Sequence, residues 1–160
     1  MCIAKAAGST RASLMLALTA ALTACGIGPV AERGSEGALA PCPSAPHCVA
    51  SQAADADHHV DPLRYAGSRE QAQARLLRAL AAQPRTRVVI AEPGYVRAEA
   101  ASALLRFVDD LEFILPPPPP GAAGVIELRS SSRIGYYDFG ANRKRIENLR
   151  AAFAQTPPGS

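Results

Sequence analysis

The sequence lacks the motifs on which common hydrolases depend. It has no Gly-x-Ser-x-Gly nucleophile elbow, and its three histidines, His47, His58 and His59, form no recognisable motif with a serine. A serine nucleophile needs a neighbouring base to activate it, so these absences argue against an acyl-transfer enzyme of that kind. We therefore expect a protein that is not an enzyme, with an enzyme of unknown reaction as the alternative.

Cysteine is also scarce. Cys42 and Cys48 are six positions apart in a turn-rich segment, and no second pair of ligands accompanies them, so a structural zinc site is not expected. Redox motifs usually have cysteines closer together at the start of a helix, so a redox pair is only an alternative. In an exported protein this spacing favours a disulfide between Cys42 and Cys48.

Between residues 55 and 61 the sequence has aspartates and histidines, which are common metal ligands. In an extended chain His58 and His59 point to opposite faces, and the aspartates Asp55, Asp57 and Asp61 share a parity only with His59. We expect this segment to be solvated and predict no metal and no cofactor.

A basic excess is missing once the first 24 residues are set aside. Lys5 and Arg11 are two of the 17 basic residues, which leaves 15 basic residues against 14 acidic ones. Nucleic-acid binding needs a concentrated basic face, so nucleic acid is not expected as a partner.

Residues 1–24 are typical of an export signal. A basic start precedes an apolar run that is too short for a comfortable membrane span. The ending Leu22-Thr23-Ala24-Cys25 resembles a bacterial lipobox. That resemblance implies cleavage before Cys25, a diacylglycerol on its thiol and a further acyl chain, such as palmitate, on the new amine. An ordinary secretory signal is the alternative.

The residue after Cys25 is Gly26 and not the aspartate that typically retains lipoproteins in the inner membrane. We therefore expect the outer membrane of a bacterial cell envelope, with the protein facing the periplasm. The sequence then divides into a signal peptide at 1–24, a flexible Gly-, Ala- and Pro-rich tether at 25–41, one domain at 42–155 and a disordered tail at 156–160.

Hydrophobic periodicity predicts the elements of that domain. The expected strands span residues 60–65, 86–91, 95–101, 104–115 and 125–134, and the expected helices begin at Ser68 and at Ala141 or Asn142. Ser68 and Gln71 form a capping-box pattern, and Pro84 stops the first helix. The order β-α-β-β-β-β-α predicts an α+β fold: a two-layer sandwich with a mainly antiparallel sheet of about five strands and two helices on one face.

Alternation in the two longest strands predicts which side chains face the helices. The predicted inner set is Leu105, Phe107, Leu111, Phe113, Leu115, Ile126, Leu128 and Ile134, together with Asp109 as a polar exception. Apolar residues must pair with apolar residues, so either Asp110 or Glu112 lies opposite Arg129. The other face is expected to be wet or to meet a partner.

Polar residues in this half of the chain form the candidate site. They are Arg106, Asp109, Asp110, Arg129, Ser132, Arg133, Asp138, Asn142, Arg143 and Arg145. Asp109 is the most informative of them, because a buried carboxylate must find donors or change its pKa. The expected donors are Ser130 or Ser132, Arg143 or Arg145, or backbone amides. Asp138 and Asn142 are also placed to cap the last helix, whose start could instead bind an anion.

Several segments together resemble a known family. They are CPSAPHCVAS from Cys42, GYVRAE from Gly94, LRFVDDLEF from Leu105, and RSSSRIGYYDFGANRKRI from Arg129. These are similar to the domain of unknown function 1499 (DUF1499) family, which implies a single exported or membrane-linked domain without a settled activity. The element order also resembles helix-grip domains, an analogy of fold alone.

The sequence therefore predicts a lipid-anchored envelope protein, a binding or structural module that does not catalyse a reaction. Its expected partners are the membrane, through the lipid anchor, and an envelope protein or a small apolar or anionic ligand. The alternative is an enzyme that uses the polar cluster around Asp109 with Arg133, Arg143 and Arg145. A third interpretation, oligomerisation through the outer sheet face, has only a thin apolar patch to support it.

Overall fold

The computed structural model describes residues 37–102 and 106–157. The predicted signal peptide, Cys25, most of the predicted tether, Leu105 and the last three residues lie outside the described residues. Of the tether, Leu39 is described and is buried, and its amide donates a hydrogen bond to Gln52.

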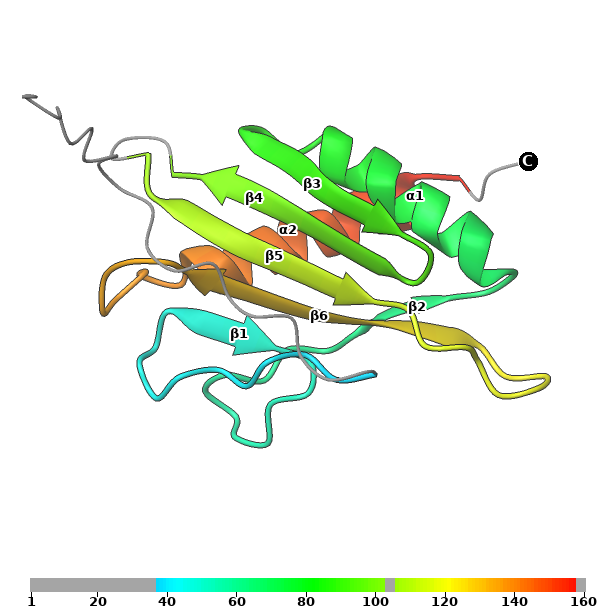
Figure 1. Ribbon diagram of the computed structural model, residues 1–160, viewed down its shortest axis with the longest axis horizontal. Helices are drawn as coiled ribbons and strands as arrows, with labels where there is room; N and C mark the ends of the chain where they lie inside the picture. Colours follow the sequence, from blue (N-terminus) through cyan, green and yellow to red (C-terminus); the bar gives the residue numbers. More distant parts are fainter. Residues whose placement is uncertain (1–36, 103–105, 158–160) are drawn as a thin grey trace, which may run out of the picture.

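The described chain forms six strands and two helices. They are β1 (Cys48–Ala50), β2 (Leu63–Tyr65), α1 (Arg69–Ala81), β3 (Thr86–Glu92), β4 (Tyr95–Ala101), β5 (Val108–Ile114), β6 (Gly124–Ser132) and α2 (Ala141–Gln155). The sheet order is β1-β6-β5-β4-β3, all pairs being antiparallel, and β2 also pairs with β6. Both helices lie behind one face of the sheet (Figure 1). The α+β sandwich is confirmed.

The prediction missed β1. This strand has only three residues, too few to show an alternation, and it follows directly on the disulfide that joins Cys42 and Cys48. The disulfide is as predicted. Both β1 and β2 pair with the same edge of β6, and a loop separates them. Residues 48–50 pair with residues 129–131, and residues 63–65 pair with residues 124–126.

One glycine is required by close packing at this edge. Gly124 lies opposite Tyr65, and a Cβ on Gly124 would come within 2.1 Å of the Tyr65 ring. The ring therefore covers the backbone where a side chain would otherwise be, and only glycine fits there.

The helices begin where the sequence predicts. Ser68 caps α1 in a reciprocal capping box with Gln71, and α2 begins at Ala141. Arg75 joins the two helices, because its Nε donates to the carbonyl of Phe153 at 2.7 Å and its guanidinium lies 4.2 Å from the centre of the Phe153 ring. Among the described residues, neither helix has the length and apolar character needed to cross a membrane.

The core lies between the helices and the inner sheet face. Leu111, Phe113 and Leu128 are buried there, as the alternation predicts. Phe107 and Ile134 were predicted in the core and are exposed instead. The reason is that the strands are shorter than predicted: β5 begins at Val108, after Arg106 in the left-handed region with φ of 53°, and β6 ends at Ser132.

The predicted pairing of Glu112 with Arg129 is confirmed by the register of β5 and β6. The alternative, in which Asp110 lies opposite Arg129, is wrong, because Asp110 lies opposite Ser131. The expectation of a wet outer face fails for the middle of β5, where Asp110 and Glu112 are only 2% and 1% exposed. Alternation identifies the face of a side chain but not whether long neighbouring side chains cover it.

Phe113 and Phe107 provide a direct test of this assignment. Phe113→Ala should lower the free energy of unfolding by about 3–5 kcal/mol, because it removes a fully buried ring from the core. Phe107→Ala, at a site 40% exposed, should change it by less than about 1 kcal/mol. Urea unfolding followed by circular dichroism measures both, and equal losses would contradict the assignment.

Candidate functional site

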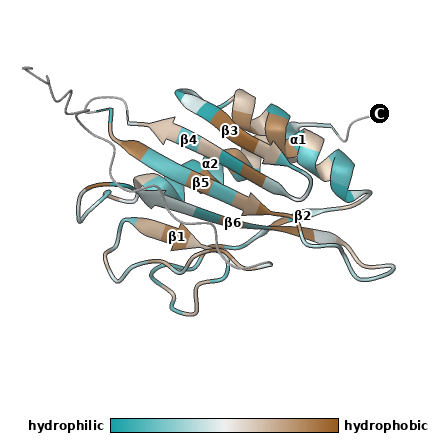
Figure 2. Cartoon of the chain, viewed as in Figure 1, coloured by the Kyte–Doolittle hydropathy of each residue, from teal (hydrophilic) through white to brown (hydrophobic). Residues whose placement is uncertain are grey.

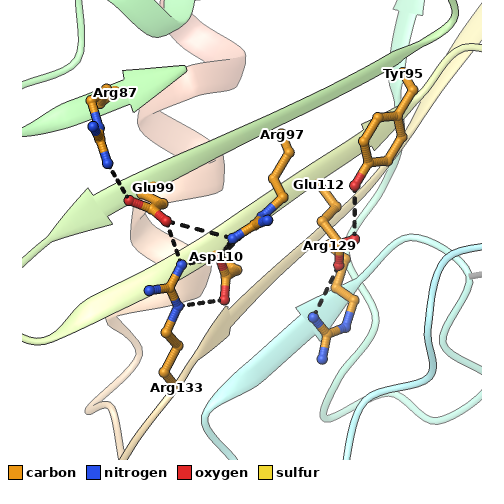
Figure 3. A network of polar contacts seen from close by, with 8 residues as sticks. All are labelled: Arg87, Tyr95, Arg97, Glu99, Asp110, Glu112, Arg129 and Arg133. Carbon is orange, nitrogen blue, oxygen red and sulfur yellow. Dashed lines mark hydrogen bonds and ion pairs between the residues drawn. The ribbon is translucent and has the colours of Figure 1, made fainter. Parts of the chain in front are cut away.

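The outer face of the sheet has a chain of ion pairs across three neighbouring strands and the residue after β6 (Figure 3). At its centre is Asp110 of β5, whose Oδ1 accepts from Arg97 at 3.1 Å and from Arg133 at 2.8 Å. Glu99 of β4 accepts from Arg133 as well, and from Arg87 of β3 at 2.9 Å. The charges therefore alternate in sign, so each carboxylate lies between cations.

A second, smaller group lies beside it on the same face (Figure 3). Glu112 accepts from the Tyr95 hydroxyl at 3.2 Å and from Nη1 of Arg129 at 3.2 Å. Nε of Arg129 is buried without a hydrogen-bond partner. Figure 2 shows hydrophilic stretches within β4, β5 and β6, among more hydrophobic ones.

The two central carboxylates have pKa values shifted in opposite directions. Burial tends to raise the pKa of Asp110, but hydrogen bonds and charge from Arg133 and Arg97 outweigh it and hold the pKa below its ordinary value. Burial raises the pKa of Glu112 above its ordinary value, because a single arginine and a neutral tyrosine compensate less. Glu112 has fewer cationic partners than Asp110, and the negative charge of Asp110 also raises the pKa of Glu112.

Asp109 lies on the opposite, inner face, among the core residues. Its Oδ2 accepts from Nη2 of Arg145, which reaches across from α2. Arg145 also donates from Nη1 to Asn142 at 2.7 Å and to Ser130 at 3.4 Å. Of the donors that the sequence suggests, Arg145 is the one that binds this carboxylate, and the ion pair fixes the last helix to the sheet.

Asn142 joins three parts of the molecule and is fully buried. Its Oδ1 accepts from the Ser130 hydroxyl at 2.6 Å, and its Nδ2 donates to the carbonyl of His47 at 2.9 Å and to the Ser132 hydroxyl at 3.1 Å. One amide thereby links α2, β6 and the loop closed by the disulfide. Such a fully satisfied buried group specifies one arrangement of those parts.

Asp138 lies two residues before the N-cap of α2 and accepts hydrogen bonds from amides at the start of this helix. The N-cap itself is Gly140, which has no side chain to offer. Instead Oδ1 of Asp138 accepts from the Gly140 amide and Oδ2 from the Asn142 amide, both at 2.9 Å. Asp138 therefore satisfies free amides of the first helical turn, which was one of the two roles suggested for it.

The structure divides the predicted site residues between the two faces of the sheet. Asp110, Arg129 and Arg133 lie on the outer face, whereas Asp109, Ser132, Asp138, Asn142 and Arg145 lie on the inner face or at the start of α2. The remaining two join neither group. Arg143 donates to the carbonyls of Asp57 and His59, and Arg106 is exposed before β5.

Three residues of β4 belong to the outer groups and were not among the candidates: Tyr95, Arg97 and Glu99. The signal that could have identified them is the alternation of Arg97 and Glu99 with small apolar residues along this strand. Antiparallel pairing then places Arg97 opposite Glu112 and Glu99 opposite Asp110.

The histidine-rich loop has a structural arrangement. Nδ1 of His58 lies 2.7 Å from Oδ1 of Asp55, and the carbonyls of this loop accept from Arg143 and Arg150 of α2. Within residues 37–102 and 106–157 there is no group of three or more acidic, histidine or cysteine side chains close enough to hold a metal ion.

Exposed large apolar side chains gather at one end of the sheet, near the start of β5 and the end of β6. Among the described residues they are Phe107, Ile134, Tyr136, Tyr137 and Phe139, which we call the aromatic end. The ring centres of Tyr136 and Tyr137 lie 5.0 Å apart, and those of Tyr137 and Phe139 lie 6.5 Å apart. Phe139 is 97% exposed and has a φ of 54°, an unusual conformation for a residue other than glycine.

The buried carboxylates on both faces are therefore already neutralised by arginine. Such pairs suit a structural role better than proton transfer, because a general base has to be free to accept a proton from a substrate.

The ion-pair chain on the outer face gives a test of its structural role. Asp110→Asn should lower the free energy of unfolding at pH 7 by about 3 kcal/mol, because Arg97 and Arg133 lose their buried partner and keep only Glu99 as a shared anion. Asp110 has a lowered pKa in the folded state, so its contribution is present above the unfolded value of 3.8 and is lost as the pH falls below it. The difference in the free energy of unfolding between wild type and Asp110→Asn should therefore become smaller in acid.

Urea unfolding at pH 7 and in a series of buffers below pH 4 measures this effect. Glu147→Gln is the matched control, since its pair with Arg150 is on the surface and should contribute less than about 1 kcal/mol. A deficit for Asp110→Asn that does not depend on pH would show that the ion pairs are not its cause.

Comparison with known proteins places the chain in a family. The family model described as "Protein of unknown function (DUF1499)" matches residues 38–153, which include all six strands and most of α2. Neither the curated proteins nor the solved structures contain a match. The chain belongs to the DUF1499 family.

Proposed function

We propose that this protein is a lipid-anchored module of the bacterial envelope that binds a partner protein through the aromatic end and catalyses no reaction. The anchor is Cys25, at the end of a sequence that resembles a lipobox. The observation that carries the binding role is the clustering of all five exposed large apolar side chains of the described residues at one end of the sheet.

Exposed apolar groups of this kind mark interaction surfaces, because a soluble domain gains nothing from keeping them in water. Tyrosine in particular is enriched in the centres of protein interfaces, where its ring is buried and its hydroxyl finds a partner. Tyr136, Tyr137 and Phe139 offer this combination on a loop held at its base by Asp138.

A protein partner fits this surface better than an anionic membrane. A peripheral membrane site combines aromatic residues with free cations that contact the headgroups. Two arginines near the aromatic loop are engaged elsewhere: Arg133 binds Asp110 and Glu99, and Arg143 binds the carbonyls of Asp57 and His59. Arg106, next to Phe107, is exposed, so the aromatic end has fewer exposed cations than a membrane site would use.

The enzyme alternative requires a polar cluster around Asp109 with Arg133, Arg143 and Arg145. Only Arg145 contacts Asp109, and Arg133 lies on the other face of the sheet. The geometry therefore favours a binding role over this alternative.

The anchor is tested by its acceptor residue. Cys25→Ser should abolish incorporation of labelled palmitate and leave the signal segment attached as a larger precursor on a denaturing gel, because the thiol that carries the diacylglycerol is gone. Cys2→Ser is the matched control and should change neither readout, since Cys2 lies in the segment that is removed. A wild-type protein without acyl chains would contradict the proposed anchor.

The binding surface is tested by a photo-reactive benzoylphenylalanine at position 139 of the full chain in its native cells. Phe139 is 97% exposed, so the substitution should leave the fold intact and should give a light-dependent adduct with one protein. Tyr136→Ser in the same chain should reduce that adduct, because it removes part of the contact surface. The readout is the mass of the adduct on a denaturing gel and its identity by mass spectrometry.

The same reagent at Ala122, an exposed position in the loop at the other end of the β5–β6 hairpin, is the control. Equal adducts from both positions, adducts with lipid alone, or no adduct at position 139 would each overturn the assignment of the aromatic end as a protein-binding surface.

A further inference from the structure

A cavity of about 290 Å³ lies between the end of β4, the turn from α1 to β3 and the first turns of α2. Asp109 and Arg145 form part of its wall, which also includes Thr86, Ser102 and the exposed side chains of Arg85 and Lys144. This volume is at the low end of the range for small-molecule sites, so the cavity suits a small ligand or one group of a larger ligand.

The charge of this cavity is positive. Arg85, Lys144 and Arg145 contribute three cations, and Asp109 is the single carboxylate among the described residues that line it. Asp109 is neutralised by Arg145. The wall therefore has a net charge of about +2, whereas the ion pairs on the outer sheet face leave little charge uncompensated.

Arg145 is held in place by the groups around it. Its Nη2 donates to Asp109 and its Nη1 to Asn142 and Ser130, so the guanidinium is fixed against the end of β5 and β6. Its Nε makes no hydrogen bond to residues 37–102 or 106–157. An arginine oriented in this way loses little freedom when it binds an anion.

Arg85 is also held in place. Its φ is 54°, and two hydrogen bonds join it to Ala101: Nε donates to the Ala101 carbonyl at 3.2 Å, and the Ala101 amide donates to the Arg85 carbonyl at 3.0 Å. Both terminal nitrogens of this guanidinium and the ammonium group of Lys144 make no hydrogen bond to residues 37–102 or 106–157. They provide donors directed at solvent or at a ligand.

We propose that this cavity binds a small molecule that has a phosphate group. A phosphate monoester has a charge of about −1.5 to −2 at pH 7, which matches the charge of the wall better than a monoanionic carboxylate does. Arginine side chains that are fixed in position are the usual partners of phosphate oxygens, and lysine adds a mobile point charge. Hydroxyl groups of Ser102 and Thr86 can bind the remaining oxygens.

This site goes beyond the proposed protein-binding function and uses different residues. Arg85 and Lys144 are not members of the aromatic end, and Phe139, Tyr136 and Tyr137 do not line the cavity. The two proposals can therefore fail separately.

The test is a titration of the full processed protein in detergent with inorganic phosphate at constant ionic strength, followed by calorimetry. Wild type should show saturable binding of one phosphate. Arg85→Gln and Lys144→Gln should each weaken the affinity by about ten-fold, because each removes a charge-assisted hydrogen bond. Both side chains are exposed at the rim, so neither change should unfold the protein.

Arg87→Gln is the matched control. Arg87 lies two residues further along the chain, is 77% exposed and pairs with Glu99 on the outer face. Its loss should leave the affinity for phosphate unchanged. Absence of saturable binding in wild type, or an equal loss of affinity in Arg87→Gln, would overturn the proposal, since the latter indicates only general attraction between opposite charges.

A second arm identifies the source of the phosphate. Glycerol 3-phosphate is a soluble probe, and vesicles of phosphatidic acid in phosphatidylcholine present the same group on a membrane. Binding that is lost in Arg85→Gln and is competed by inorganic phosphate supports the site with either probe. The probe that binds more tightly then indicates whether the phosphate belongs to a free molecule or to a lipid headgroup.

Discussion

The burial of β5 on both faces is the constraint on which the rest of the structure depends. Consecutive carboxylates, Asp109 and Asp110, point to opposite faces of this strand, and both are buried. A buried charge is tolerated only when it is paired, so each face must supply arginines. The inner face recruits Arg145 from α2, and the outer face recruits Arg97 from β4 and Arg133 from the end of β6. The position of the last helix and the register of three strands are thereby coupled through one pair of residues.

The sequence predicted the features that depend on alternation and capping. The capping box at Ser68 and the inward position of Leu111 and Phe113 follow from local hydrogen bonding and from side-chain periodicity. Periodicity limited the partner of Arg129 to Asp110 or Glu112, and the structure selects Glu112. The residues at which a strand begins or ends could not be predicted from periodicity. The alternation of the β5 region continues through Phe107, but Arg106 takes a left-handed conformation, and the strand begins only at Val108.

The candidate site shows the same division. Asp109 was identified from its parity, and its partner Arg145 was among the donors considered. The grouping of Arg133 with Asp109 did not hold. Arg133 shares the outer parity of Arg129 in the predicted 125–134 strand, and it binds Asp110 on that face. The cavity beside Asp109 depends on Arg85, whose position in the turn between α1 and β3 relative to Ala101 is a tertiary relation that no local pattern contains.

Both edges of the sheet are interrupted. On one side β1 and β2 have three residues each. The loop between them is held against α2, because Arg143 and Arg150 of that helix donate hydrogen bonds to its carbonyls. On the other side, β3 has an irregularity in its pairing between Val88 and Ile90. Short or irregular edge strands do not offer a continuous ladder of amides and carbonyls to another chain. Recognition of this domain by addition of a foreign strand is thus disfavoured, and in a crowded compartment copies of it are hindered from joining sheet to sheet into aggregates.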